Sequence, residues 1–275
     1  MALTKVLIVV KTYPALSKKY DELVCTAGFR EDGRWVRIYP IPFRKLEYDS
    51  RYKKYQWIEL DLKRNTSDPR PESYKPVNYE KIKLCDFIDT DKGYWSRRKE
   101  IVLNKVYTNL SSLIEEAKDG NIRTSLAVFK PKEIIDFKIE ETEREWNPEL
   151  IAQLNAKAKQ FDLFSNSDNP FEAVNKVPYK FSYEFIDENE KSSTLKIEDW
   201  ETGQLYWNSL KRHEGNEHKA YIDVRKKYFD DFAKTKDLYL FLGTTREFHF
   251  VAPNPFIIIG TFHPKIDSQL KLFST

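Results

Sequence analysis

Strand patterns separated by short turns dominate the first third of the chain. Residues 5–11 form a continuous apolar run between two lysines, which predicts a strand buried on both faces. Residues 23–29 predict a second strand, and the turn residues 31–33 predict a hairpin into a third strand that starts at Trp35. Residues 56–63 alternate apolar and polar side chains, as a strand with one solvent-facing side does. Four strands with short connections predict a small, strongly curved sheet or barrel at the N-terminal end.

The rest of the chain mixes strand patterns with segments of helical spacing. Residues 110–117 carry apolar side chains on one helical face, and a second helix is predicted where Asn147 is a suitable N-cap before Pro148. Two more helices are predicted over residues 199–211 and 217–233. Further strands are predicted over residues 125–130, 133–141, 179–186, 238–242 and 256–262. We therefore predict an α+β protein whose C-terminal part is a mixed sheet with packed helices.

A cluster of turn-forming residues, Asn-Ser-Asp-Asn-Pro at 166–170, predicts a boundary between two halves. The predicted division has three parts. A basic, β-rich nucleic-acid-binding domain spans residues 1–165, an α+β domain spans 171–265, and a C-terminal tail spans 266–275.

The charge of the chain is small in total but unevenly distributed. The formal net charge is +3, yet residues 1–83 hold 18 Lys and Arg against 11 Asp and Glu, whereas the remaining residues hold 28 against 32. Aromatic residues make up 15% of the chain, which excludes low-complexity disorder. Because aromatic residues interleave with the excess of basic ones, the first third has the composition of a nucleic-acid-binding surface.

The strand from Trp35 is the best candidate for that surface. Side chains alternate along a strand, so Trp35, Arg37 and Tyr39 would share one face while Val36 and Ile38 point into the core. Arginine binds phosphate or base edges and aromatic rings stack on exposed bases. The alternative interpretation is a half-exposed edge strand with large amphipathic side chains.

Basic and aromatic residues near this strand extend the predicted interface. The Pro-rich segment 65–76 is expected to cross the surface as an ordered loop. The predicted nucleic-acid-binding residues are Lys11, Lys18, Lys19, Tyr20, Arg34, Trp35, Arg37, Tyr39, Arg44 and Arg70.

A reaction on an extruded base is one enzymatic hypothesis. Such a reaction needs an aromatic-lined pocket and a carboxylate that stabilises a cationic sugar or activates water. Asp21 and Glu22 are the candidate catalytic residues, because their loop is expected to approach the Trp35 strand. The alternative is that they only balance the charges of Lys18 and Lys19.

A metal-dependent nuclease is a second enzymatic hypothesis. Glu59, Asp61 and Lys63 would lie on one strand face and Asp49 precedes them, which loosely resembles the Asp…(Asp/Glu)-x-Lys arrangement of such nucleases. The carboxylates would hold Mg²⁺ and the lysine would orient water. The same alternation is typical of any solvated strand face.

Other cofactors, metals and membranes are not indicated. Cys25 and Cys85 are too few for a disulfide framework and have no zinc-ligand spacing. No Gly-rich phosphate loop or dinucleotide fingerprint is present, and the apolar run 6–10 is too short for a membrane span. We expect a cytoplasmic protein without a metal site or cofactor, apart from Mg²⁺ under the nuclease hypothesis.

Two resemblances add to this interpretation. Gln269-Leu270-Lys271-Leu272-Phe273 resembles the pentapeptide by which bacterial DNA polymerases and repair proteins bind the sliding clamp, with Lys271 departing from its usual Ser or Asp. The resemblance implies that Gln269, Leu270, Leu272 and Phe273 contact the clamp. The chain also resembles uncharacterised prokaryotic proteins that share Lys-Thr-x-Pro, here residues 11–14, and Arg-Ile-Tyr-Pro, here residues 37–40.

These observations favour a protein that binds DNA and acts on a flipped or modified base, or on a single strand, in repair or anti-phage defence. Its enzymatic activity would be glycosylase-like or nucleolytic. The alternative from a different class is a non-enzymatic subunit whose Trp and Tyr side chains bind another protein.

Overall fold

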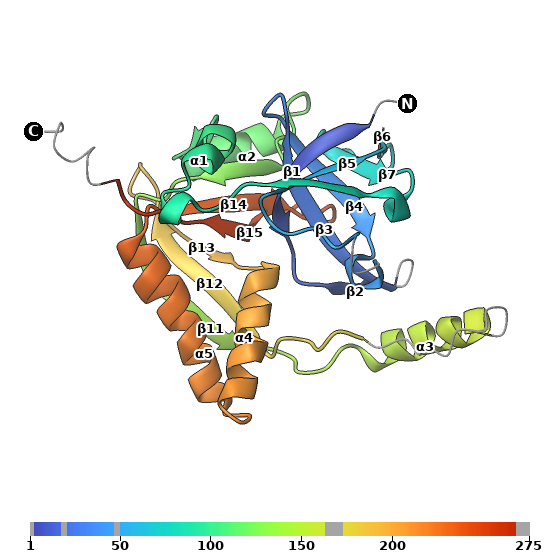
Figure 1. The fold of residues 1–275 in the computed structure, drawn as a ribbon. Coiled ribbons are helices and arrows are strands. Elements are labelled where there is room, and N and C mark those ends of the chain that lie inside the picture. Colours follow the sequence, from blue (N-terminus) through green and yellow to red (C-terminus); the bar gives the residue numbers. More distant parts are fainter. Residues whose placement is uncertain (1–2, 18–20, 47–49, 163–172, 268–275) are drawn as a thin grey trace, which may run out of the picture.

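A computed structural model describes residues 3–17, 21–46, 50–162 and 173–267 (Figure 1). Its N-terminal part is an eight-stranded, curled sheet with the order β6-β7-β4-β3-β1-β5-β8, in which β2 pairs with β3. The strands are β1 (Thr4–Lys11), β2 (Ala15–Ser17), β3 (Asp21–Arg30), β4 (Trp35–Ile41), β5 (Gln56–Leu60), β6 (Leu62–Arg64), β7 (Ser73–Pro76) and β8 (Lys83–Phe87). The prediction of a small curved N-terminal sheet is confirmed.

The C-terminal part contains two smaller sheets and most of the helices. A four-stranded sheet has the order β15-β14-β10-β9, and a three-stranded sheet has the order β11-β12-β13. The strands are β9 (Val106–Tyr107), β10 (Leu126–Phe129), β11 (Glu133–Glu141), β12 (Tyr179–Ile186), β13 (Ser192–Lys196), β14 (Tyr239–Thr244) and β15 (Phe256–Phe262). The helices are α1 (Ser96–Val102), α2 (Leu110–Lys118), α3 (Pro148–Asp162), α4 (Trp200–Arg212) and α5 (Glu217–Arg225), which continues as a π-helical segment (Lys226–Ala233). Figure 1 shows α4 and α5 beside the three-stranded sheet, so the predicted α+β class is confirmed.

The middle of the curled sheet is buried because its strands are apolar on both faces. Residues 6–10 of β1 are all fully buried, as the continuous apolar run predicts. β3 pairs with β1 and approaches it closely at Gly28, where an added Cβ would collide with the backbone carbonyl of Leu7. The curled sheet and the four-stranded sheet then share one core, in which Val10 and Phe29 pack in the same cluster as Val128 and Phe241.

The predicted boundary at residues 166–170 lies outside the described residues. Strands from either side of it pair with each other: β10 pairs with β14, and β11 pairs with β12. Both C-terminal sheets therefore draw on the chain before and after that segment.

Candidate nucleic-acid interface

The hairpin between β3 and β4 places three large side chains at one end of the curled sheet. The turn is closed by hydrogen bonds from the Gly33 N–H to the Arg30 carbonyl and from the Arg30 N–H to the Arg34 carbonyl, both 2.9 Å. Gly33 has a φ of 78°, a left-handed conformation that favours glycine. The tight turn thereby fixes Arg30, Arg34 and Trp35 close together.

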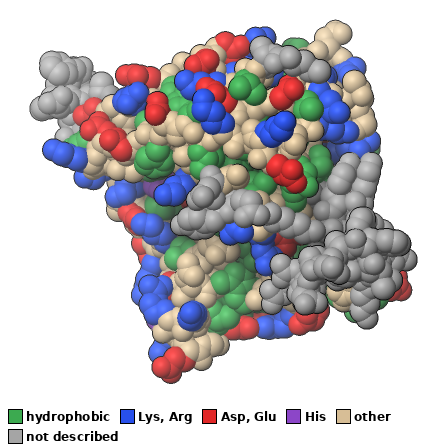
Figure 2. Space-filling model, turned by 45° about the vertical axis from the view of Figure 1, so that its right-hand side comes forward, with side chains coloured by type: hydrophobic (Ala, Val, Ile, Leu, Met, Phe, Trp, Pro, Cys, Tyr) green, Lys and Arg blue, Asp and Glu red, His purple; other side chains and the backbone are tan. Residues whose placement is uncertain are grey.

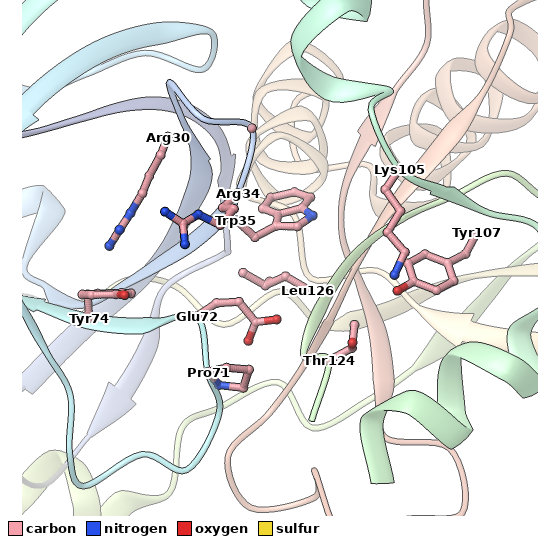
Figure 3. A pocket seen from close by; sticks show the side chains of 11 residues that line it. Arg30, Arg34, Trp35, Pro71, Glu72, Tyr74, Lys105, Tyr107, Thr124 and Leu126 are labelled. Carbon is pink, nitrogen blue, oxygen red and sulfur yellow. The ribbon is translucent and has the colours of Figure 1, made fainter. Parts of the chain in front are cut away.

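These side chains line a pocket of about 440 Å³ between the curled sheet and the four-stranded sheet (Figure 3). Four segments that are far apart in the sequence form its walls. The lining residues are Arg30, Gly33, Arg34, Trp35, Pro71, Glu72, Tyr74, Lys105, Tyr107, Thr124 and Leu126. We call this hollow the basic aromatic pocket.

Aromatic rings lie on opposite sides of the pocket. Trp35 packs one side against Phe29, with ring centroids 4.0 Å apart, and meets Phe241 edge-on at 5.8 Å. Figure 3 shows Trp35 and Tyr107 across the hollow from each other, with Leu126 and Glu72 below Trp35 and the ammonium of Lys105 beside the ring of Tyr107. The phenol of Tyr107 donates to the carboxylate of Glu116, and burial together with that carboxylate raises the pKa of Tyr107. Two rings held by their neighbours therefore line a space of ligand size, and the ammonium of Lys105 lies 4.5 Å from the ring centre of Tyr107.

Three cations surround the same space. The guanidinium carbon of Arg30 lies 4.4 Å from the ring centre of Tyr74, and its buried Nε has no hydrogen-bond partner among the described residues. Arg34 is 77% exposed and bonds Asp32, while Lys105 lies 3.4 Å from Glu116. Exposed ion pairs of this kind contribute at most about 1 kcal/mol. Arg34 and Lys105 can therefore exchange these carboxylates for a phosphate at little cost.

Glu72 supplies a fixed hydrogen-bond acceptor in the pocket. One carboxylate oxygen accepts the Ser125 N–H at 3.1 Å, and the other accepts the Ser125 hydroxyl at 2.7 Å. An ionised carboxylate accepts up to about four hydrogen bonds, so Glu72 keeps capacity for a ligand.

Arg37 is not part of this surface, and the prediction that it faces solvent is wrong. Its side chain is 2% exposed and donates to the Ser125 hydroxyl at 2.7 Å, the Ser125 carbonyl at 3.0 Å and the Thr244 carbonyl at 3.4 Å. β4 is a central strand whose two faces are both covered, so Val36 and Ile38 are buried as well. Tyr39 is half-buried. Trp35 is half-buried too, so no solvent-facing stripe forms, and of the three residues only Trp35 lines the pocket.

Arg70 is also buried, in contrast to its predicted exposure. Its guanidinium forms two hydrogen bonds with Asp68, at 2.9 and 2.7 Å, and a third with the Thr244 carbonyl. Arg37 on β4 and Arg70 in the loop before β7 thus both donate to the carbonyl of Thr244 on β14. These hydrogen bonds connect the curled sheet to the four-stranded sheet, and the Ser125 hydroxyl that accepts from Arg37 also donates to Glu72.

The other predicted residues lie away from the pocket or outside the described residues. Arg44 is exposed and bonds Glu22 at 2.6 Å, and Glu22 is buried. Lys18, Lys19 and Tyr20 lie outside the described residues, and the side chain of Asp21 is not described. Neither Glu22 nor Arg44 is among the residues that line the pocket. On the face drawn in Figure 2, acidic and basic side chains are interspersed.

Lys11 lies in an aromatic environment of its own. Its ammonium is 4.6 Å from the ring centre of Phe43 and 5.7 Å from that of Trp200, and it donates to the Tyr52 carbonyl at 3.5 Å. Burial, with the positive charge of Lys54, lowers the pKa of Lys11 to about 8.

We expect Lys11 to lose its proton near pH 8, whereas an ordinary lysine does so at about 10.4. NMR of the lysine side-chain signals between pH 6 and 11 measures the titration midpoint of Lys11. The Lys11 signal is assigned by its absence in Lys11→Arg. A Lys219→Arg variant, which replaces an exposed lysine, is the control and should keep the signal that titrates near pH 8. A midpoint for Lys11 above 10 would contradict the described environment.

Of the residues proposed for a nuclease, Glu59, Asp61 and Lys63 do not lie on one continuous strand. The strand breaks at Asp61, so Glu59 belongs to β5 and Lys63 to β6, and Glu59 bonds Lys83 at 2.9 Å. Asp49 lies outside the described residues. Within the described part of the chain, no group of three or more His, Cys, Asp or Glu could hold a metal ion.

Sequence reasoning identified Arg34 and Trp35 but missed Arg30, Glu72, Lys105, Tyr107 and Thr124 as pocket residues. One available signal was the pattern Lys105-Val106-Tyr107, which places a cation and a ring on the same side of a short strand. The partner segments of such a strand are set by tertiary contacts.

Comparison with known families is consistent with this architecture. Residues 2–104 match a domain of unknown function, DUF8758, and residues 106–275 match a second one, DUF8757. The chain belongs to the DUF8757 family. The expectation of an uncharacterised family is confirmed, and no curated protein matches the chain. The basic aromatic pocket is lined by residues of both regions. Arg30, Trp35 and Glu72 belong to the DUF8758 region, and Tyr107 belongs to the DUF8757 region.

Two further predictions concern the tail and membranes. The clamp-binding pentapeptide, with Gln269, Leu270, Leu272 and Phe273, lies outside the described residues and remains a prediction. Among the helices that the structure describes in this DUF8757 protein, none is long and apolar enough to cross a membrane.

Proposed function

We propose that the protein binds DNA through the basic aromatic pocket, which accepts a base from a single strand or a base extruded from a duplex. The observation that carries this proposal is that Trp35 and Tyr107 line one hollow together with the cations of Arg30, Arg34 and Lys105. A base has an aromatic face that stacks on such rings, while the adjacent phosphates bind cations.

Glu72 gives the pocket an acceptor for the edge of the base. Its two bonds to Ser125 fix the carboxylate before any ligand arrives. A fixed acceptor favours bases that present amino or imino donors. Stacking, phosphate binding and edge recognition are thus available within one pocket.

Fluorescence anisotropy with labelled oligonucleotides tests this function. A 20-nucleotide single strand, a matched duplex and a duplex with one mismatch would be titrated at several salt concentrations. We expect Trp35→Leu to weaken single-strand binding by about 5-fold to 100-fold, because stacking contributes about 1–3 kcal/mol per base. Arg34→Ala is expected to weaken binding and to lower the salt dependence by about one phosphate contact.

The exposed Lys219 on α5 provides a matched control, since Lys219→Ala removes one positive charge away from the pocket. The affinity of Lys219→Ala for the oligonucleotides should stay within about twofold of that of wild type. Absence of binding to all three oligonucleotides at 50 mM salt would overturn the proposal. So would Trp35→Leu and Arg34→Ala variants that bind as wild type does.

A further inference from the structure

The loop between β14 and β15, residues 245–255, exposes an unusual group of apolar side chains. Phe248 is 50% exposed, Phe250 46% and Val251 74%. A single exposed apolar residue is ordinary, but three within four positions indicate a contact surface. We call these three residues the apolar tip.

The apolar tip is held in place by the buried histidine between its two phenylalanines. His249 is fully buried, and its Nδ1 lies 2.9 Å from the Thr244 hydroxyl. The Phe248 N–H donates to the Thr245 hydroxyl at 3.3 Å, and the Ala252 N–H donates to the Phe248 carbonyl at 3.1 Å. These bonds order the loop before it meets a partner, which reduces the entropy lost on binding.

The loop starts beside the basic aromatic pocket. Thr244, the last residue of β14, donates its N–H to the Ser125 carbonyl at 3.1 Å, and Ser125 holds Glu72. The neighbours of Ser125 in the chain, Thr124 and Leu126, line the pocket, and Leu126 pairs with Gly243. The apolar tip and the pocket thus belong to the same end of the four-stranded sheet.

Charge near the apolar tip suits a polyanion. Arg246 and Glu247 are both exposed within the loop, so their charges offset each other. Positive charge lies beneath the tip instead: burial lowers the pKa of His249, and the charges of Arg70, Arg37 and Arg123 lower it further. Arg123, next to Thr124, also has a buried Nε without a hydrogen-bond partner among the described residues. Proteins that open or bend duplex DNA insert apolar side chains between base steps next to basic contacts.

We propose that the apolar tip is a wedge that inserts between bases of duplex DNA and helps to extrude the base that the basic aromatic pocket receives. This inference rests on the proposed function, because the pocket supplies the binding site for the extruded base. The wedge replaces part of the stacking that the neighbouring bases lose.

A mismatched duplex that carries 2-aminopurine at the mismatch tests the wedge, since the fluorescence of this base rises when it is unstacked. Wild-type protein is expected to raise the fluorescence. The double variant Phe248→Ala/Val251→Ala should abolish the rise and weaken duplex binding by about tenfold, while single-strand affinity stays within about twofold. Both side chains are exposed, so the variant should fold normally, as circular dichroism can verify. Ile135→Ala on β11, which also removes an exposed apolar side chain, is the matched control and should behave as wild type.

The possible results distinguish failure of the wedge proposal from failure of the pocket proposal. If the double variant raises the fluorescence as wild type does, the wedge is overturned and the pocket proposal stands. If the variant loses single-strand and duplex affinity equally, the tip is a general contact and does not open the duplex. If wild type binds no oligonucleotide, the proposed function fails and the wedge fails with it. Binding of a protein that Phe248→Ala/Val251→Ala abolishes, without any fluorescence change on DNA, assigns the tip to a protein interface.

Discussion

Replacing Lys54 by methionine is expected to lower the free energy of unfolding by about 3–5 kcal/mol at pH 7.5. Lys54 is buried and donates to both carboxylate oxygens of Asp199, at 2.7 and 3.0 Å, and to Glu201 at 3.0 Å. Asp199 is 1% exposed and is the N-cap of α4. Loss of the ammonium would leave a buried carboxylate uncompensated where the curled sheet meets α4.

The loss should depend on pH. Burial opposes the charge of Lys54, but the carboxylates of Asp199 and Glu201 outweigh it and raise the pKa of Lys54. Burial raises the pKa of Asp199 to about 6 even though Lys54 opposes the shift. Without Lys54 the pKa of Asp199 rises further above its unfolded value, so the folded variant binds a proton that the unfolded chain does not. Its stability should then increase as the pH falls from 7.5 to 5.

Urea unfolding followed by tryptophan fluorescence at pH 7.5 and pH 5 measures both effects. Lys53→Met removes an exposed neighbouring charge and should change stability by less than about 0.5 kcal/mol. The double variant Lys54→Met/Asp199→Asn should recover much of the loss. If the double variant is as unstable as Lys54→Met, the cost comes from altered packing and the interpretation through an uncompensated charge is wrong.

The strands and helices could be predicted where local pattern decides them. The apolar run 5–11 became β1, and helical spacing from Leu110 became α2, whose buried face is the predicted one. The helix predicted over residues 199–211 became α4, and Asp199 is its N-cap, whose carboxylate accepts the Glu201 N–H. These features depend on residues close in the sequence.

The environment of each strand could not be predicted in the same way. A charged residue in an alternating strand is normally assigned to solvent, and Arg37 was assigned so. Its acceptors, Ser125 and Thr244, lie 88 and 207 residues further along the chain. The pocket has the same origin, since its hairpin is local but Glu72 and Tyr107 reach it through packing between sheets. Local pattern therefore predicted Arg34 and Trp35, and tertiary contacts determined the rest.

Arg37 gives a direct test of this distinction. Arg37→Met is expected to lower the free energy of unfolding by about 2–4 kcal/mol, because three buried, charge-assisted hydrogen bonds to Ser125 and Thr244 are lost. The Thr244 carbonyl keeps Arg70 as a donor, and the Ser125 carbonyl keeps the Thr244 N–H. Relief of the repulsion between the nearby charges of Arg37 and Arg70 offsets part of this loss. Arg37→Lys should restore only part of the stability, since an ammonium cannot reproduce the fork of the guanidinium. Urea unfolding with an unchanged m-value measures the change.

DNA binding by the same variant distinguishes a role of Arg37 in stability from a role in contacting nucleic acid. The guanidinium lies behind Glu72 and does not line the basic aromatic pocket, so folded Arg37→Met should bind single strands within about threefold of wild type. Arg34→Ala should show the opposite pattern, with weaker binding and nearly unchanged stability, because its exposed ion pair with Asp32 contributes at most about 1 kcal/mol. An Arg37→Met protein with wild-type stability and greatly weakened binding would instead place this arginine on the nucleic-acid surface that its alternation in the sequence first indicated.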